Sequence, residues 1–255
     1  VGNALADKAT GRKFHLAVML HQLTPLPGRS FSLDDPVELD RVRELLSPAQ
    51  ATWMRATMVT NSHGATTGKD GTSNSLSRGA DRTLLGVLRS HADAVVLGAT
   101  TLRHERIPIP RRAALVILSH TGTIAWENLV RPTDAAGRVI VMTTSPEAGL
   151  VASGDSDTAQ VIVMEPGLTP EKLAALIRGT VGGGGLLIEG GRNVWKQFAP
   201  LCDDLWLAVS PPPVSDREGL PSWWPVGETS WNLSALYTDE ARMLYYHHRA
   251  VRGAP

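Results

Sequence analysis

Short runs of Val, Ile, Leu and Ala recur along the chain and predict strands of a sheet that is covered on both faces. The runs are DAVVLG (93–98), AALVIL (113–118), RVIVM (138–142), VIVM (161–164), LLIE (186–189) and DDLWLAVS (203–210). Continuous apolar strands are typical of parallel sheets with helices on both sides. TWMRATMVT (52–60) also predicts a strand, in which Arg55, Thr57 and Val59 share one face.

Amphipathic segments between these runs predict the covering helices. DDPVELDRVRELL (34–46) places acidic residues ahead of a first-turn proline, and residues 78–91 place leucines on one side. Thr169 and Pro170 provide an N-cap and a first-position proline for a further helix, and residues 192–199 predict a short one. The alternation of strand and helix favours an α/β fold.

The two ends of the chain predict additions to this sheet. FHLAVML (14–20) predicts a strand, and WNLSALYT with RMLYYHHRAV predicts a closing hairpin around Asp239-Glu240. A long loop, which includes Trp223 and Trp224, precedes the hairpin. We therefore expect a mixed, mostly parallel sheet flanked by helices, with a C-terminal β-hairpin. Residues 1–50 are expected to form a partly helical N-terminal extension, and residues 51–255 the main domain.

Charge and cysteine content exclude several classes of function. Lys plus Arg and Asp plus Glu both total 25, so no surface for nucleic acid or an anionic membrane is expected. No apolar run reaches transmembrane length. The single Cys202 allows no intramolecular disulfide, which suits the cytoplasm. The adjacent His247 and His248 point to opposite strand faces, so we expect no metal site.

Two glycine-bearing turns point to a nucleotide ligand. Gly98 ends one apolar strand before a helix, and Gly190-Gly191 end another in the same way. Ligands of open α/β sheets bind outside the carboxyl ends of strands, and glycine lets backbone amides approach a phosphate closely. Glycines that serve tight turns alone would give the same pattern. G-x-G-x-x-G is absent, and GATTGKD (64–70) has the wrong spacing for a P-loop.

Residues 71–106, GTSNSLSRGADRTLLGVLRSHADAVVLGATTLRHER, resemble the reductase domain of bacterial riboflavin biosynthesis. LIEGGRNVWKQF and DDLWLAVSPPP resemble a second signature of the same family. The resemblance covers roughly residues 52–250. It implies a dihydrofolate-reductase-like fold, a cytoplasmic homodimer and an NADPH-dependent reduction of 5-amino-6-(5-phosphoribosylamino)uracil, with hydride transfer to ribose C1′.

The resemblance also implies roles for individual residues. The substrate positions are Ser73, Arg89, Ile109, Arg112 and Glu189. The cofactor positions are Val59, Ser75, Thr101, Glu105, Ser119 and the turn that starts with Gly190, Gly191, Arg192, Asn193 and Val194 and runs to Gln197; Gly98 joins them from the glycine pattern. The catalytic positions are Thr57, His63 and Glu189.

Three departures from the family pattern keep several functions open. Thr57 stands where the family usually has a lysine, His63 where it has an aspartate, and Pro211-Pro212-Pro213 where a strand ends in P-x-x-x-G. A riboflavin-type pyrimidine reductase fits the residues best. A pterin reductase is a second reading and requires an acidic residue that faces the pterin ring. A nucleotide-binding module without catalysis is a third.

Overall fold

The computed structural model describes residues 4–6, 13–15, 17–134, 136–145, 159–211 and 231–251. The helices are α1 (Pro36–Leu45), α2 (Asp81–His91), α3 (Ala99–His104), α4 (Pro170–Val181) and α5 (Arg192–Phe198), and short 3₁₀ turns lie at Trp126–Asn128 and Ala199–Leu201. The strands are β1 (Ala4–Ala6), β2 (Lys13–His15), β3 (Met19–Thr24), β4 (Ser30–Ser32), β5 (Trp53–Asn61), β6 (Ala94–Gly98), β7 (Ile107–Pro108), β8 (Ala114–Ser119), β9 (Leu129–Val130), β10 (Val139–Thr143), β11 (Ala159–Val163), β12 (Gly185–Ile188), β13 (Asp204–Ser210), β14 (Trp231–Asp239) and β15 (Leu244–Ala250).

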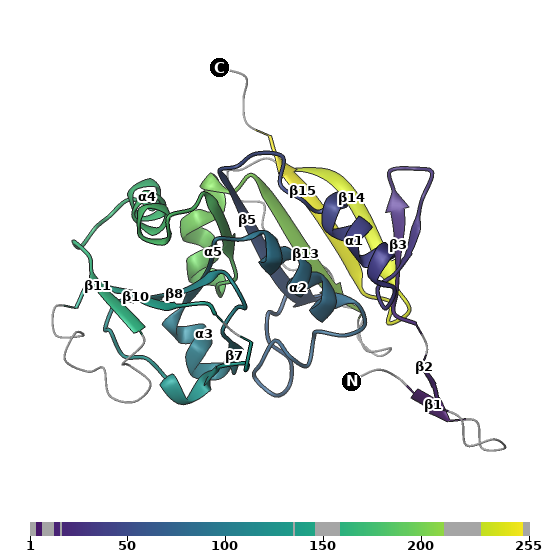
Figure 1. Ribbon diagram of the computed structural model, residues 1–255, viewed down its shortest axis with the longest axis horizontal. Helices are drawn as coiled ribbons and strands as arrows, with labels where there is room; N and C mark the ends of the chain where they lie inside the picture. The colour runs from purple at the N-terminus through teal and green to yellow at the C-terminus, as the bar shows by residue number, and fades with distance from the viewer. Residues whose placement is uncertain are drawn as a thin grey trace.

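One sheet of 11 strands organises the molecule, in the order β11-β10-β8-β6-β12-β5-β13-β15-β14-β3-β4. Neighbouring strands from β11 through β13 are parallel, whereas those from β13 through β4 are antiparallel. Figure 1 shows this sheet running from β11 at the left to β3 at the right. The expected α/β class is confirmed, with a mixed and mostly parallel sheet and a C-terminal hairpin.

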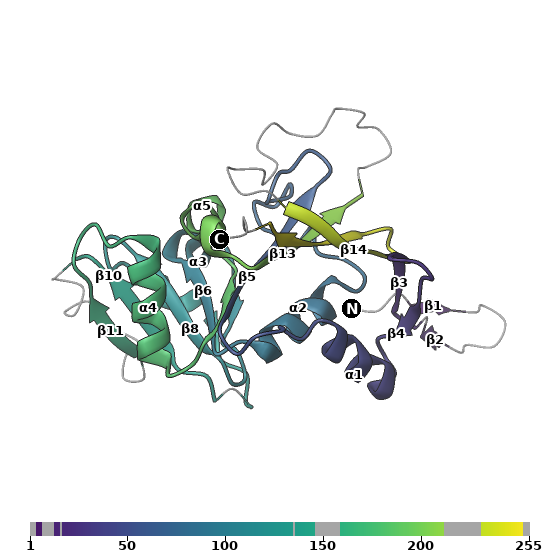
Figure 2. The same cartoon turned by 90° about the horizontal axis from the view of Figure 1, so that it is seen from above.

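Helices cover both faces of the parallel part, as the continuous apolar strands predicted. On β6, Val95 and Leu97 belong to a core that includes Leu84 and Leu88 of α2. Their strand neighbour Val96 belongs to a second core, with residues of α4 and α5. Because successive side chains point to opposite faces, one strand serves both cores. Figure 2 shows α1 and α2 following one another along the same side of the sheet.

Local capping explains where the helices begin. The Asp35 carboxylate accepts hydrogen bonds from two amides at the start of α1, and Thr169 does so once for α4. The starts expected for these helices are therefore confirmed. The helix expected from residue 78 begins only at Asp81, because Gly79 has a left-handed φ of 52° that interrupts the helical turn.

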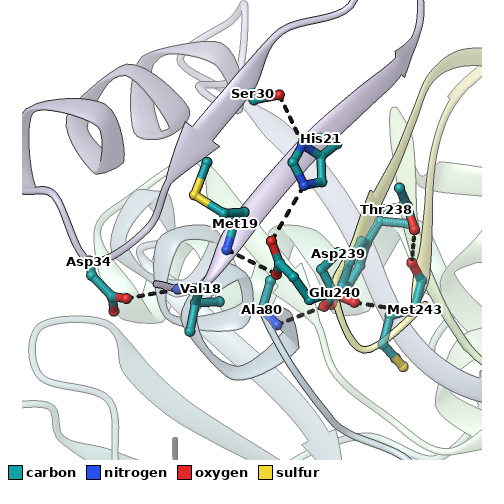
Figure 3. Close-up of polar contacts among 11 residues, drawn as sticks. Val18, Met19, His21, Ser30, Asp34, Ala80, Thr238, Asp239, Glu240 and Met243 are labelled. Atoms are coloured by element: carbon teal, nitrogen blue, oxygen red, sulfur yellow. Dashed lines mark hydrogen bonds and ion pairs between the residues drawn. The ribbon is translucent and has the colours of Figure 1, made fainter. Parts of the chain in front are cut away.

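The N-terminal segment adds two strands to the main sheet. β3 pairs with β14 of the hairpin, and β4 pairs with β3. The strand expected at 14–20 is wrong in its bounds, since the Val18 amide donates to the Asp34 carboxylate at 2.7 Å and β3 begins at Met19. Figure 3 shows β3 against the hairpin turn, where Met19 and His21 contact Glu240.

Some expected features lie outside the described residues, among them Pro212-Pro213 and the Trp223-Trp224 pair. Within the described ranges, none of the helices has the length and apolar character needed to cross a membrane. The same residues hold no cluster of three His, Cys, Asp or Glu side chains that could bind a metal ion.

Candidate active site

A large pocket opens on the α2 side of the sheet, where β5, β6, β8 and β12 end. It encloses about 1230 Å³ and is lined by α2, α3, the start of α5 and the loop that follows β5. Pockets for small ligands typically measure about 300–1,000 Å³. The cavity therefore has room for a dinucleotide and a second small molecule together.

Most residues expected in the site line this one cavity, although they come from separate parts of the chain. They are Thr57, Val59, Ser73, Arg89, Gly98, Thr101, Glu105, Ser119, Glu189, Gly190, Gly191, Arg192, Asn193 and Val194. Parallel strands bring their carboxyl ends to one edge of a sheet, so the loops that follow them meet there. Both glycine-bearing turns open into the same space.

Four expected site residues are not among those that line the cavity. His63 lies in the turn after β5, where its amide donates to the Asn61 side chain at 3.0 Å. The Ser75 hydroxyl donates to Asp70 at 2.7 Å. Ile109 is a core residue that is 4% exposed, and Arg112 is exposed on the surface. The structure therefore does not bring these four residues to the cavity lining.

Arg89 of α2 and Glu189 after β12 form a bidentate ion pair within the pocket. The Arg89 Nε donates to Glu189 Oε1 at 2.7 Å, and Nη2 donates to Oε2 at 2.5 Å. The two side chains are 18% and 9% exposed. Glu189 reaches α2 because it continues the strand face of Leu187, which belongs to the α2-side core. A substrate group would meet this pair as one unit.

Two further contacts fasten the rim of the pocket. The amide and the hydroxyl of Ser73 both donate to the Glu105 carboxylate at 2.8 Å, which ties the loop after β5 to the end of α3. The Gly191 amide donates to the Thr101 hydroxyl at 3.3 Å. Expected substrate and cofactor positions thus hold one another in place around the cavity.

The two glycines after β12 differ in what surrounds them. A Cβ on Gly190 would lie 2.2 Å from the Val194 Cβ, so Gly190 permits close packing of the turn on α5. A Cβ on Gly191 would meet only the Thr101 Oγ1, at 3.5 Å, and would otherwise face open space. Gly190 therefore serves the fold, whereas Gly191 leaves backbone accessible from the pocket.

Thr57 lines the pocket, and its own strand brings no cation to the cavity lining. In the register of β5 and β13, Thr57 lies beside Trp206, which also lines the cavity. Arg55 shares the strand face of Thr57, but it is buried and its guanidinium donates to Asp204 and to the Leu46 carbonyl. These partners hold Arg55 away from the pocket.

Asp81, a residue that sequence reasoning missed, contributes a buried acid to the pocket lining. It is 8% exposed at the first turn of α2. Burial raises the pKa of the Asp81 carboxyl, and the negative charges of Asp239 and Glu189 add to this effect. Its only signal in the sequence is an acidic first helical turn, which helix capping explains equally well.

Comparison with known proteins assigns the chain to a class of riboflavin-biosynthesis proteins. Residues 53–212 match the family model described as the RibD C-terminal domain. The chain belongs to this family. A comparison with curated proteins gives no match.

Solved structures of similar fold carry names from the same area of metabolism. A pyrimidine reductase-like protein from Corynebacterium diphtheriae has a TM-score of 0.62 and 22% identity, with 84% of this chain and 98% of that one covered. A deaminase/reductase from Thermotoga maritima has a TM-score of 0.60 and 17% identity, with coverage of 79% and 57%. Riboflavin biosynthesis reductase Rib7 from Saccharomyces cerevisiae gives 0.58 and 13%, with coverage of 84% and 100%. At these low identities, the TM-scores show a shared fold alone.

Proposed function

We propose that this chain is an NADPH-dependent reductase that acts on a phosphoribosylamino-pyrimidine, such as the uracil intermediate of riboflavin biosynthesis. The observation that carries the proposal is the meeting of both glycine-bearing turns, Thr57 and Glu189 in one cavity. Family membership supports a reductase, and the size of the cavity supports two ligands side by side.

The residues present fit a nicotinamide dinucleotide. Gly191 places no side chain between the turn and the cavity, and its amide donates to the Thr101 hydroxyl, which holds the turn in place. Gly98, Ser119 and the residues Arg192 to Val194 line the adjoining wall. These groups would hold the phosphates and ribose units, and the bound cofactor would supply the hydride.

The remaining pocket residues would position the substrate and stabilise the charge that develops during reduction. Reduction of the ribosylamino group breaks the C1′–O4′ bond of the ribose, adds hydride to C1′, which stays bonded to nitrogen, and puts a proton on O4′. Thr57 would donate one neutral hydrogen bond near that oxygen, without the charge of a lysine. The Arg89–Glu189 pair would orient polar groups of the substrate, because both side chains are fixed before a ligand arrives.

Assembly as a homodimer belongs to the same proposal and rests on the family alone, whereas a cytoplasmic location rests on the single Cys202 as well. Light scattering of the purified protein tests it, and a mass of 27.3 kDa, the value for one chain, would contradict the dimer.

The test of function is oxidation of NADPH, followed by absorbance, with a panel of substrates. The panel contains the phosphoribosylamino-uracil, its dephosphorylated analogue and dihydropterins. Turnover of the first compound supports the proposal. NADPH binding without turnover of any compound would favour the nucleotide-binding module, and absence of NADPH binding would overturn the cofactor assignment.

A pterin reductase is the second candidate, and Asp81 is the observation that favours it. A pterin presents two neighbouring N–H donors, which a buried carboxyl can bind together. Asp81 supplies such a group within the pocket lining. Asp81→Asn keeps the shape of the side chain but removes its charge and replaces one acceptor with a donor. Loss of pterin turnover with retained NADPH affinity would support this candidate, whereas unchanged turnover would contradict it.

A further inference from the structure

The turn of the C-terminal hairpin carries a buried carboxylate, Asp239, that contacts the start of α2. Asp239 is 5% exposed. Its Oδ2 accepts hydrogen bonds from the Ala80 amide at 2.8 Å and from the Tyr245 hydroxyl at 2.7 Å. Its Oδ1 accepts from the Met243 amide at 3.0 Å. Figure 3 shows Asp239 between Ala80 and Met243. Three donors therefore fix this carboxylate beside the residue that precedes Asp81.

Gly79 provides independent evidence that the hairpin turn and the start of α2 are closely fitted. A Cβ on Gly79 would lie 2.2 Å from Asp239 Oδ2 and 2.9 Å from the Ala241 Cβ. Gly79 also has a left-handed φ of 52°, which side-chain-bearing residues rarely adopt. The backbone at this point has both the space and the conformation that the approach of Asp239 requires.

Asp239 is also connected to the pocket through two aromatic residues, Tyr245 and Trp206. The Tyr245 ring, whose hydroxyl binds Asp239, stacks on Trp206 with centroids 6.0 Å apart. Trp206 and Asp81 both line the cavity. Asp239 thus holds two parts of the pocket at once, the start of α2 directly and Trp206 by way of Tyr245.

We propose that Asp239 is the positioning residue of the pocket acid Asp81: it fixes the start of α2 and keeps a negative charge close to that carboxyl. The family match ends at residue 212, so this role comes from a hairpin outside the matched region. The proposal concerns the pocket itself and stands apart from the choice of substrate.

The charges around Asp81 give the expected direction of the effect. Ser77 donates a hydrogen bond to it from the preceding loop, and Arg82 of the same helix brings a positive charge. Glu189 after β12 and Asp239 on the hairpin bring negative charges. Like charges disfavour ionisation, so Asp239 raises the pKa of Asp81 together with burial. Asp81 consequently keeps its proton to a higher pH than an exposed aspartate does.

The neighbouring Glu240 provides a matched control on the same turn. Its carboxylate accepts from the Met19 amide at 3.1 Å and lies 3.4 Å from the His21 imidazole, so it faces β3 and not α2. Glu240→Gln removes one charge from the turn, as Asp239→Asn does. A positioning role for Asp239 predicts different results for these two variants, whereas a general effect of net charge predicts the same result.

The experiment is a carboxyl-carbon NMR titration of Asp81 in the full chain without ligand, with the signal assigned by its disappearance in Asp81→Asn. We expect Asp239→Asn to shift the Asp81 midpoint to lower pH and Glu240→Gln to leave it unchanged. No shift in Asp239→Asn, or an equal shift in both variants, would overturn the proposal. Because neither substrate nor cofactor is present, this outcome is independent of the proposed reductase activity.

Gly79→Ala provides a second variant if Asp239→Asn does not fold. The added methyl group displaces Asp239 and leaves every charge in the chain. Gly167→Ala matches its backbone strain, because Gly167 has a φ of 79° and no atom within 4 Å of its Cβ position. The proposal predicts a lower Asp81 midpoint in Gly79→Ala and an unchanged one in Gly167→Ala. Unchanged midpoints in both variants would refute it.

Discussion

Arg89 binds both carboxylate oxygens of Glu189 across the pocket, over a separation of 100 residues in sequence. Both side chains are mostly buried. We predict that Arg89→Met lowers the free energy of unfolding by about 2–3 kcal/mol, because Glu189 becomes a lone charge in a largely dry site. Urea denaturation at neutral pH measures this loss.

A double-mutant cycle measures the interaction energy between Arg89 and Glu189 separately from their contacts with other residues. We expect Glu189→Gln to recover part of the stability that Arg89→Met removes, because the unpaired charge is then gone. Because Arg89 is already paired with Glu189, it is not expected to bind a substrate phosphate. Loss of Arg89 should weaken the binding of phosphorylated and dephosphorylated substrates alike, and a loss confined to phosphorylated ligands would mean that Arg89 leaves Glu189 to bind phosphate.

Gly190 is predicted to be required for the stability of the fold. Alanine there would place its Cβ 2.2 Å from the Val194 Cβ, within the first turn of α5. Overpacking of this kind typically costs about 1–3 kcal/mol. We expect Gly190→Ala to lower the melting temperature measured by calorimetry, and an unchanged value would mean that α5 moves away without cost.

Gly191 is predicted to be required for cofactor binding and not for stability. Its φ of −65° and ψ of 178° suit any residue, and its Cβ position faces open space. Gly191→Val should therefore fold with little loss of stability, yet weaken NADPH binding by roughly tenfold or more, a cost of about 1.4 kcal/mol. Fluorescence titration with NADPH tests this, and unchanged affinity in the folded variant would refute the placement of the cofactor.

Most of the parallel sheet was predictable, because its central strands β6, β8, β10 and β12 are apolar on both faces. The strands at 113–118 and 138–142 appear as β8 and β10 with bounds shifted by one residue. The N-terminal strand was less predictable. Its partner β14 follows roughly two hundred residues later, and the bounds of β3 depend on that pairing and on the Asp34 contact at Val18.

The site was predictable where a residue follows a strand of the parallel sheet, as for Gly98 and Glu189. Side-chain partners were not, because they depend on register. Arg55 shares a strand face with Thr57, yet the paired position on β13 is Asp204, which binds Arg55 in the interior. Asp81 needed the tertiary structure, since an acid in a first helical turn is an ordinary feature of solvent-exposed helices.

Asp204 is predicted to make the fold sensitive to acid. Burial opposes its ionisation, but the nearby imidazole of His247 and the charge of Arg55 outweigh this and lower the pKa of Asp204. A pKa that is lower in the folded state stabilises the fold above the unfolded value, and this stability is lost as pH falls through the folded one. Asp204→Asn should therefore destabilise the protein at neutral pH by about 3 kcal/mol.

The difference between wild type and Asp204→Asn should shrink as pH falls below about 4, where a free aspartate becomes protonated. Urea denaturation at a series of pH values measures it. Asp134→Asn is the matched control, because Asp134 pairs with Arg111 on the surface with side chains 56% and 78% exposed. Exposed pairs contribute little, so this variant should follow the wild type throughout. A constant difference for Asp204→Asn at every pH would contradict the role of its charge.

Thr57 is predicted to limit the rate of reduction. Breaking the C1′–O4′ bond of the ribose leaves negative charge on O4′, which a lysine ammonium would stabilise while hydride adds to C1′. Thr57 brings a neutral donor, Arg55 is held by Asp204, and His63 lies outside the cavity lining. Removal of one electrostatic donor typically costs about 10²- to 10³-fold in rate. We therefore expect Thr57→Lys to raise turnover of the phosphoribosylamino-uracil substantially.

The length-matched variant Thr57→Met separates charge from size at this position. It fills the same part of the pocket and brings no cation, so we expect it to lower turnover while Thr57→Lys raises it. NADPH affinity should change little in either variant, because the glycine-bearing turn lies after a different strand, β12. If the wild type already turns over rapidly and Thr57→Lys only slows it, the threonine belongs to a working site. The missing cation would then have no catalytic consequence, and the proton for the alkoxide would come from another pocket acid, of which Asp81 is the buried candidate.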